Sequence, residues 1–302
     1  MQGEDDQHYL LLKRLVQILV ELGGQVCAVW SLKEPNCGKP ENLHIYLDAL
    51  LAFTNHNSLM VNYYANELWA KFCRHSDIVK DDVFKTYMPK WVEIALKKAV
   101  KVGYPSKDDH PSCAYARMDF ETDEEFSSCF GRYRIIMSEV IRMISALNPT
   151  IPFQYCDHWL KNVLSRPIQE KVHKNSQVYL ELDAIQYALE AILGKLNPKE
   201  ELTSILSPGL ALLKLCLDYN AMNDPMLLSV LLSCISSLFA VVTVTPDALS
   251  PTLTCIFKCI TFKKEAPEQN DEIRMLRRHG CALLVKIATR YDKVLHIFFL
   301  MI

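Results

Sequence analysis

The chain has 302 residues, 50% of them hydrophobic, with nine glycines and a formal net charge of −2. This composition excludes a disordered chain, because disordered segments are poor in aliphatic residues and rich in net charge. The small net charge also excludes a uniformly cationic coat for nucleic acid, so any such contact must come from a local basic patch.

The eleven cysteines are irregularly spaced and form no CxxC pair, and the first residues carry no signal-peptide pattern. Together these features predict a chain that works in a reducing, intracellular compartment.

Apolar residues recur with helical periodicity along the chain, and no convincing alternating strand pattern is present. The first helix reaches about residue 30, with a break expected at Gly23 and Gly24. Further helices are expected at residues 41–54, 58–75, 82–102, 122–147, 152–164, 177–193, 209–219, 225–241, 247–261 and 270–290.

Helix-capping residues and helix-breaking glycines and prolines mark the boundaries between these helices. Thr122 followed by Glu125 is a capping box, which predicts a helix start. Residues 103–121 contain Gly103, Pro105 and Pro111, and they predict a long irregular loop. A second irregular segment is expected at 165–176, and residues 292–302 form an atypical end.

Helices of this length joined by short turns predict an all-α fold, a right-handed α-solenoid of antiparallel helix pairs with HEAT-like repeats. The whole range 1–302 is interpreted as a single solenoid segment of a longer protein, because apolar helices stand at both ends without a cap.

Residues 225–246 carry one stretch without charge that is long enough to cross a bilayer. Serines and threonines dilute its apolarity, and Asp224 with Pro225 forms a helix-start signal. We therefore expect a buried helix of the array and no membrane partner.

The sequence contains none of the nucleotide-binding, hydrolase or metalloprotease motifs, so we expect no enzyme and no cofactor. Two weak metal alternatives exist. One is the cluster Asp108, Asp109 and His110, and the other combines the pair Cys255 and Cys259 with His279 and Cys281. In each case solvated polar residues or core cysteines are the expected explanation, and no metal site is predicted.

Two charged stretches have both a functional and a structural interpretation. Residues 119–125 carry five acids, which suit a basic partner or the first turn of a helix. A lysine-rich helix with an expected solvated face contains Lys85, Lys90, Lys97, Lys98 and Lys101.

The segment IRMLRRHGCALLVKI, residues 273–287, combines an apolar stripe with basic residues. Leu276, Gly280 and Leu283 fall on one face, while Arg274 and Arg278 stand one turn apart on the other, with Arg277 at the flank. Two guanidinium groups at this spacing can bind phosphates. Lys263 and Lys264 extend this basic patch toward the N-terminus. Pairing with Glu265, Glu268, Asp271 or Glu272 is the structural alternative.

Three long strings resemble the middle of the exportin-five family of nuclear export receptors, within the karyopherin-β class. They are residues 26–58, residues 102–126 (VGYPSKDDHPSCAYARMDFETDEEF) and IRMLRRHGC at 273–281. The resemblance covers nearly the whole chain, with gaps near 165–176 and after about 292.

The resemblance implies a carrier that shuttles between nucleus and cytoplasm. Its partners would be precursor microRNA hairpins with a 3′ overhang and other structured small RNAs such as transfer RNA, together with Ran-GTP and nucleoporins. Ran would be bound mainly by repeats that this chain lacks.

The resemblance also implies site residues. Arg278 falls on the family position that binds the RNA overhang, and Glu139 falls on an acidic partner position. An arginine can neutralise phosphate and a carboxylate can accept a ribose 2′-hydroxyl. The structural alternative for Glu139 is an i, i+3 pair with Arg142. The predicted RNA-binding residues are Arg278, Arg277, Arg274, Glu139, Lys263 and Lys264.

One departure from the family pattern is Ala282, which stands where the family has a serine shortly after the arginine pair. The alternative hypothesis is therefore a protein-binding α-solenoid scaffold without RNA binding, which the missing hydroxyl and the mild net charge favour.

Overall fold

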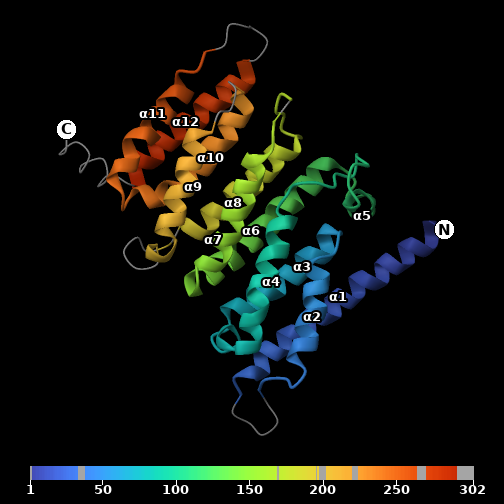
Figure 1. The fold of residues 1–302 in the computed structure, drawn as a ribbon. Coiled ribbons are helices and arrows are strands. Elements are labelled where there is room, and N and C mark those ends of the chain that lie inside the picture. The colour runs from blue at the N-terminus through green and yellow to red at the C-terminus, as the bar shows by residue number, and fades with distance from the viewer. Residues whose placement is uncertain are drawn as a thin grey trace. The chain divides into compact units, whose positions relative to one another are not determined.

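A computed structural model describes residues 2–32, 38–168, 170–194, 196, 202–219, 224–263 and 270–290. Helices make up all regular structure in these residues, as the sequence predicts, so the fold is all-α (Figure 1). The predicted end segment 292–302 lies outside the described residues. The chain divides into two compact units, residues 1–147 and 148–302.

Unit 1 is built around α3, which packs against α1, α2 and α6. Its core is aromatic, and fully buried Trp69 and Trp91 donate their indole N–H groups to Thr54 (2.8 Å) and Asn66 (3.0 Å). The elements are α1 (Gln2–Trp30), α2 (Leu43–Thr54), α3 (Leu59–Arg74), η1 (Ile78–Lys80), α4 (Asp82–Lys98), α5 (Ser112–Asp119) and α6 (Asp123–Leu147).

Helix α1 runs unbroken through Gly23 and Gly24, so the predicted break is wrong. Gly23 serves a close approach instead: a Cβ there would clash with Leu68 of α3 and with the Tyr46 hydroxyl of α2. The absent side chain lets the helices pack closely, and the helical hydrogen bonds outweigh the lower helix propensity of glycine.

Residues 103–121, predicted to be an irregular loop because of Gly103, Pro105 and Pro111, contain a short helix. Pro111 stands at the N-cap position of α5, where its missing N–H costs nothing, and the helix buries Cys113 and Ala116. The capping box that follows is confirmed on its hydroxyl side, because the N–H of Glu125 donates to Thr122 Oγ1 at 3.2 Å. The Glu125 carboxylate accepts from the N–H of Glu121 rather than from that of Thr122.

Unit 2 is built around α10, which packs against α8, α9 and α12. Asp224 caps α10 by accepting from the N–H groups of Met226 (2.9 Å) and Leu227 (3.0 Å). The elements are α7 (Thr150–Ser165), α8 (Gln177–Leu193), η2 (Thr203–Ile205), α9 (Leu206–Asp218), α10 (Pro225–Val242), η3 (Pro246–Ala248), α11 (Leu249–Ile260) and α12 (Asn270–Arg290).

Among the described residues, α10 is the one helix long and apolar enough to cross a membrane, with a mean hydropathy of 2.2. However, 78% of this segment is buried inside the protein, as the sequence interpretation expects for a core helix. Its serines are satisfied locally, since Ser237 Oγ donates to the carbonyl oxygens of Ser233 and Gln186.

Candidate nucleic-acid interface

Helix α12 is held in unit 2 by the apolar stripe that the sequence predicts. Leu276, Leu283 and Ile287 are at most 2% exposed, and α12 packs against α10 and α11. Gly280 lies within the same stripe, where a Cβ would stand 2.6 Å from Ile260 Cγ1 of α11. The close packing fixes the opposite, basic face of α12 toward solvent.

His279 belongs to the anchoring side of the helix. Its Nδ1 lies 2.8 Å from the Ser229 hydroxyl and 3.3 Å from the Ser233 hydroxyl, both on α10. The histidine therefore orients α12 on α10 and is not part of the basic face.

Arg278 is the predicted RNA-binding arginine that has no partner among the described residues. Its side chain is exposed and makes no hydrogen bond or ion pair with the described part of the chain. A guanidinium has five N–H donors, and those of Arg278 are available to a phosphate.

The neighbouring arginines are engaged within the protein. Arg277 NH2 donates to the carbonyl oxygen of Phe262 at 2.7 Å, and Arg274 NH1 pairs with Asp271 at 3.1 Å. Both partners of the second pair are strongly exposed, at 75% and 93%, so this ion pair stabilises weakly. Each guanidinium uses one of its five N–H donors in these contacts, so further donors remain available.

The predicted extension of the patch is partly described. Lys263 is exposed and directly follows Phe262, whose carbonyl oxygen binds Arg277. Lys264 lies outside the described residues, as do Glu265 and Glu268. The remaining acid considered as an arginine partner, Glu272, pairs with Lys171 instead (3.0 Å).

Glu139 lies on α6 of unit 1 and is bound by Arg74 of α3. Arg74 donates through Nε to Oε1 (2.8 Å) and through NH2 to Oε2 (2.6 Å). The structural alternative expected Glu139 to pair with Arg142. This expectation is wrong, because α3 packs on α6 and brings the guanidinium of Arg74 to the Glu139 carboxylate. Both carboxylate oxygens are occupied, although the side chain remains 38% exposed.

Ala282 is exposed one helical turn after Arg278, on the same face of α12. A serine at this position would present its hydroxyl beside the Arg278 guanidinium. Ala282 itself offers no hydroxyl to the basic face.

Several residues of the two metal alternatives have other partners. Asp108 pairs with Arg117 (2.7 Å), and His110 Nδ1 accepts from the N–H of Ser112 (3.1 Å). Cys281 is exposed, whereas Cys259 is buried. Within the described ranges, no three His, Cys, Asp or Glu side chains come together as a metal site requires.

The acidic stretch is partly structural. Asp119 binds Lys13 (2.7 Å) and the Tyr9 hydroxyl of α1, and Asp123 accepts from the N–H and hydroxyl of Ser106. The lysine-rich helix is less uniform than a solvated face, because Lys98 is half-buried and hydrogen-bonded to Asn57 (3.1 Å).

Sequence reasoning missed the groups that hold the predicted site, namely Arg74 and the Phe262 carbonyl oxygen. No local signal marks them, since Arg74 is 65 residues from Glu139 and Phe262 is 15 residues from Arg277.

An all-α chain with closely packed consecutive helices and an exposed basic helix face is characteristic of the helical-repeat class of binding proteins. A family model described as the Exportin-5 family matches residues 6–302. The chain therefore belongs to the Exportin-5 family, which supports the interpretation of its helix pairs as HEAT-like repeats.

Individual relatives agree with this assignment. Exportin-5 of Mus musculus is 33% identical over 311 residues, covering 96% of this chain and 25% of the relative. Exportin-5 of Homo sapiens is 31% identical over 315 residues, covering 97% and 26%. Protein MSN5 of Saccharomyces cerevisiae is 26% identical over 193 residues, covering 64% and 14%. The chain thus spans about a quarter of the length of the Exportin-5 relatives.

Proposed function

We propose that this chain is the RNA-cargo-binding segment of a nuclear export receptor. Its cargo is a structured small RNA, a precursor microRNA hairpin with a 3′ overhang or a transfer RNA. Double-stranded RNA is recognised mainly by shape and phosphate contacts, which suits an exposed arginine on a rigid helix.

The observation that carries the proposal is the state of Arg278. Its guanidinium is exposed and unpaired among the described residues, while the other face of α12 is fixed in the core of unit 2. The packed helix fixes the backbone position from which this guanidinium reaches a phosphate, while the long side chain still loses rotamer freedom when it binds. Arg274, Arg277 and Lys263 supply further positive charge in the same region.

Glu139 has a secondary role in this proposal. Its carboxylate can accept a ribose hydroxyl only while sharing its oxygens with Arg74, because each oxygen already accepts one hydrogen bond. We assign it to positioning Arg74 and to a weaker contact with the RNA cargo.

The transport cycle is proposed for the longer protein, since this chain spans about a quarter of its Exportin-5 relatives. The cycle comprises Ran-GTP binding, passage past nucleoporins and shuttling between nucleus and cytoplasm. In this proposal the segment itself is a binding module, not an enzyme, and it uses no cofactor.

One set of contacts favours the alternative of a protein-binding scaffold without RNA binding. Arg274, Arg277 and Glu139 all have partners within the protein, and Ala282 offers no hydroxyl. A scaffold would leave these groups in structural roles alone.

A gel-shift titration at several salt concentrations separates the two functions. The probes are one hairpin RNA with a two-nucleotide 3′ overhang and the same hairpin with a blunt end. The export segment binds the overhang RNA more tightly and loses affinity steeply with salt. A scaffold shows no overhang preference and little salt dependence, which would reject the RNA proposal.

A further inference from the structure

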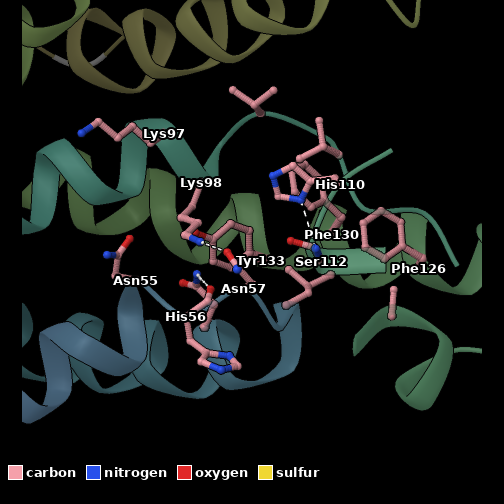
Figure 2. Close-up of a pocket in the computed structure, with 15 residues that line it drawn as sticks. Asn55, His56, Asn57, Lys97, Lys98, His110, Ser112, Phe126, Phe130 and Tyr133 are labelled. Carbon is pink, nitrogen blue, oxygen red and sulfur yellow. Dashed lines mark hydrogen bonds between the residues drawn. The ribbon is translucent and has the colours of Figure 1, made fainter. Parts of the chain in front are cut away.

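Unit 1 contains a cavity of about 270 Å³ that belongs to none of the predicted sites. It is formed by the end of α2, the starts of α3 and α6, the end of α4, and the segment leading into α5. Figure 2 shows Lys98 and Tyr133 near its middle, with His110 and Ser112 on the α5 side. Phe126 and Phe130 give it an apolar side.

Tyr133 lines this cavity, and its buried hydroxyl has no partner among the described residues. The residue is 1% exposed, and its oxygen makes no hydrogen bond to any described group. Burial raises the pKa of this phenol, so it stays protonated at neutral pH and has a proton to donate. A buried polar group with no protein partner is rare, and its hydrogen bond is usually completed by a water, an ion or a ligand.

Lys98 brings positive charge to the same space. Its Nζ donates to Asn57 Oδ1 (3.1 Å), which uses one of its three donors, and the described residues offer it no carboxylate. Burial lowers the pKa of this ammonium group, which means that it is partly desolvated without a counter-charge.

His110 contributes a third donor. Its Nδ1 accepts from the N–H of Ser112 (3.1 Å), so the neutral ring carries its proton on Nε2. Burial, followed by the charge of Lys98, lowers the pKa of His110, and the nearby Asp109 opposes this shift only in part. The ring is therefore a neutral donor at pH 7.

Other charged groups around the cavity are already engaged. Lys97 pairs with Glu93 (2.8 Å), and Asp109 accepts from Cys113 Sγ (3.6 Å). Burial and the charge of Lys98 also lower the pKa of His56, whose Nδ1 accepts from the N–H of Ser58 (3.0 Å). Lys98, Tyr133 and His110 thus keep donor groups at the cavity, beside the Asn55 amide and the Ser112 hydroxyl, which can also accept.

Gly103 fixes the segment between α4 and α5. Its φ of +89° lies in the left-handed region, and a Cβ would stand 2.5 Å from Ser112 Cβ. The backbone is thereby pressed onto the start of α5, which holds His110 and Ser112 at the edge of the cavity before any ligand arrives.

We propose that this cavity is an oxyanion site that binds a phosphate group between the Lys98 ammonium and the Tyr133 hydroxyl. Donors from α4, from α6 and from the segment before α5 approach it from separate elements. That arrangement suits a tetrahedral anion better than a planar carboxylate.

The test measures the thermal unfolding midpoint of the whole chain against inorganic phosphate, with sodium chloride adjusted to constant ionic strength. We expect phosphate to raise the midpoint, because a ligand of the folded state stabilises it. Lys98→Met should abolish the shift. Tyr133→Phe should weaken phosphate binding about fivefold. Lys85→Met, which removes an exposed lysine of the same helix outside the cavity lining, should leave it unchanged.

Two further ligands are measured in the same unfolding experiment. Phenyl phosphate shows whether the site also takes a phosphate monoester, and sodium acetate tests a carboxylate. Without phosphate, Tyr133→Phe should unfold at the same temperature as the parent chain or higher, because its hydroxyl has no partner to lose. A lower midpoint would reveal such a partner and overturn the proposal. So would absence of a phosphate shift in the parent chain, equal shifts in all variants, or acetate binding as tight as phosphate.

Discussion

Arg74 and Glu139 form a two-point ion pair between α3 and α6, with N–O distances of 2.8 and 2.6 Å. The geometry is the parallel fork that an arginine makes with a carboxylate. The side chains are 54% and 38% exposed, so solvent screens the pair and its contribution is moderate.

A double-mutant cycle with Arg74→Met and Glu139→Gln should give a coupling of about 0.5 to 1 kcal/mol, measured by urea unfolding. Additive effects would show that the pair does not stabilise unit 1. The same Glu139→Gln variant should affect overhang binding less than Arg278→Ala, because its carboxylate is already occupied.

Arg278→Ala should weaken binding of the overhang hairpin by about five- to thirtyfold, since a charged hydrogen bond contributes roughly 1 to 2 kcal/mol at such a site. The salt dependence should fall by about one unit of slope. Lys214→Ala is the matched control, because it removes one exposed positive charge from α9 of the same unit. Equal losses in both variants would mean that binding follows diffuse charge rather than this helix face.

Ala282→Ser should strengthen overhang binding by about two- to tenfold, because it adds a hydroxyl one turn from Arg278 that contributes about 0.5 to 1.5 kcal/mol. Ala288→Ser adds the same group to another exposed position of α12 and should have no effect. Filter-binding titrations of both variants provide the comparison, and an unchanged affinity in Ala282→Ser would exclude a phosphate or ribose at that position.

Glu181 is the best candidate for a pH-dependent contribution to stability in unit 2. It accepts from Arg166 (2.8 and 3.0 Å), Trp159 (2.9 Å) and Gln177 (2.8 Å). Burial acts to raise its pKa, but the hydrogen bonds from these three side chains outweigh it and hold the pKa below the usual value of 4.5.

A depressed pKa stabilises the folded state above the unfolded value, and this stability is lost as the pH falls through the folded value. The parent chain should therefore lose stability below about pH 4.5, and Glu181→Gln should show a flatter profile there. At pH 7 the variant should be about 1 to 3 kcal/mol less stable. Glu190→Gln, on the same helix, is the control; an identical acid profile in both variants would assign the pH dependence elsewhere.

The adjacent glycines of α1 should respond in opposite ways to alanine. Gly24→Ala should stabilise unit 1 by about 0.5 to 1 kcal/mol, since no described atom beyond the neighbouring backbone of its own helix lies within 4 Å of its Cβ position. Gly23→Ala should destabilise it by about 1 to 3 kcal/mol, because fully buried Leu68 has to move. Thermal unfolding of the two variants shows directly whether each alanine raises or lowers the stability. Stabilisation by both would contradict the close packing of α1 on α3.

Most of the helix positions could be predicted from the sequence because amphipathic periodicity and caps are local. The ranges of α8 and α12 are those predicted, and Asp224 caps α10 as its place before Pro225 indicates. The exception is α5, since its eight residues bury only two side chains and follow three breakers. Such a helix is stabilised by packing against its neighbours rather than by its own pattern.

The basic face of α12 was also visible in the sequence, because residues three and four apart share a face of a helix. Whether each arginine has a partner within the protein could not be read from the sequence. Arg277 and Arg278 are adjacent and both exposed, yet one binds a backbone carbonyl and the other has no partner among the described residues. The difference comes from α11, whose C-terminal end lies beside one guanidinium and not the other.

By itself the sequence determined an all-α chain, its helix faces, its resemblance to an export-receptor family and the helix that carries the basic residues. Only the tertiary structure decided which charges meet and where donors remain unpaired, as in the Arg74–Glu139 pair and the Tyr133 cavity. The physical reason is that helix formation depends on neighbours within a few residues. Ion pairs and cavities depend on the packing of segments dozens of residues apart, whose spacing no local pattern records.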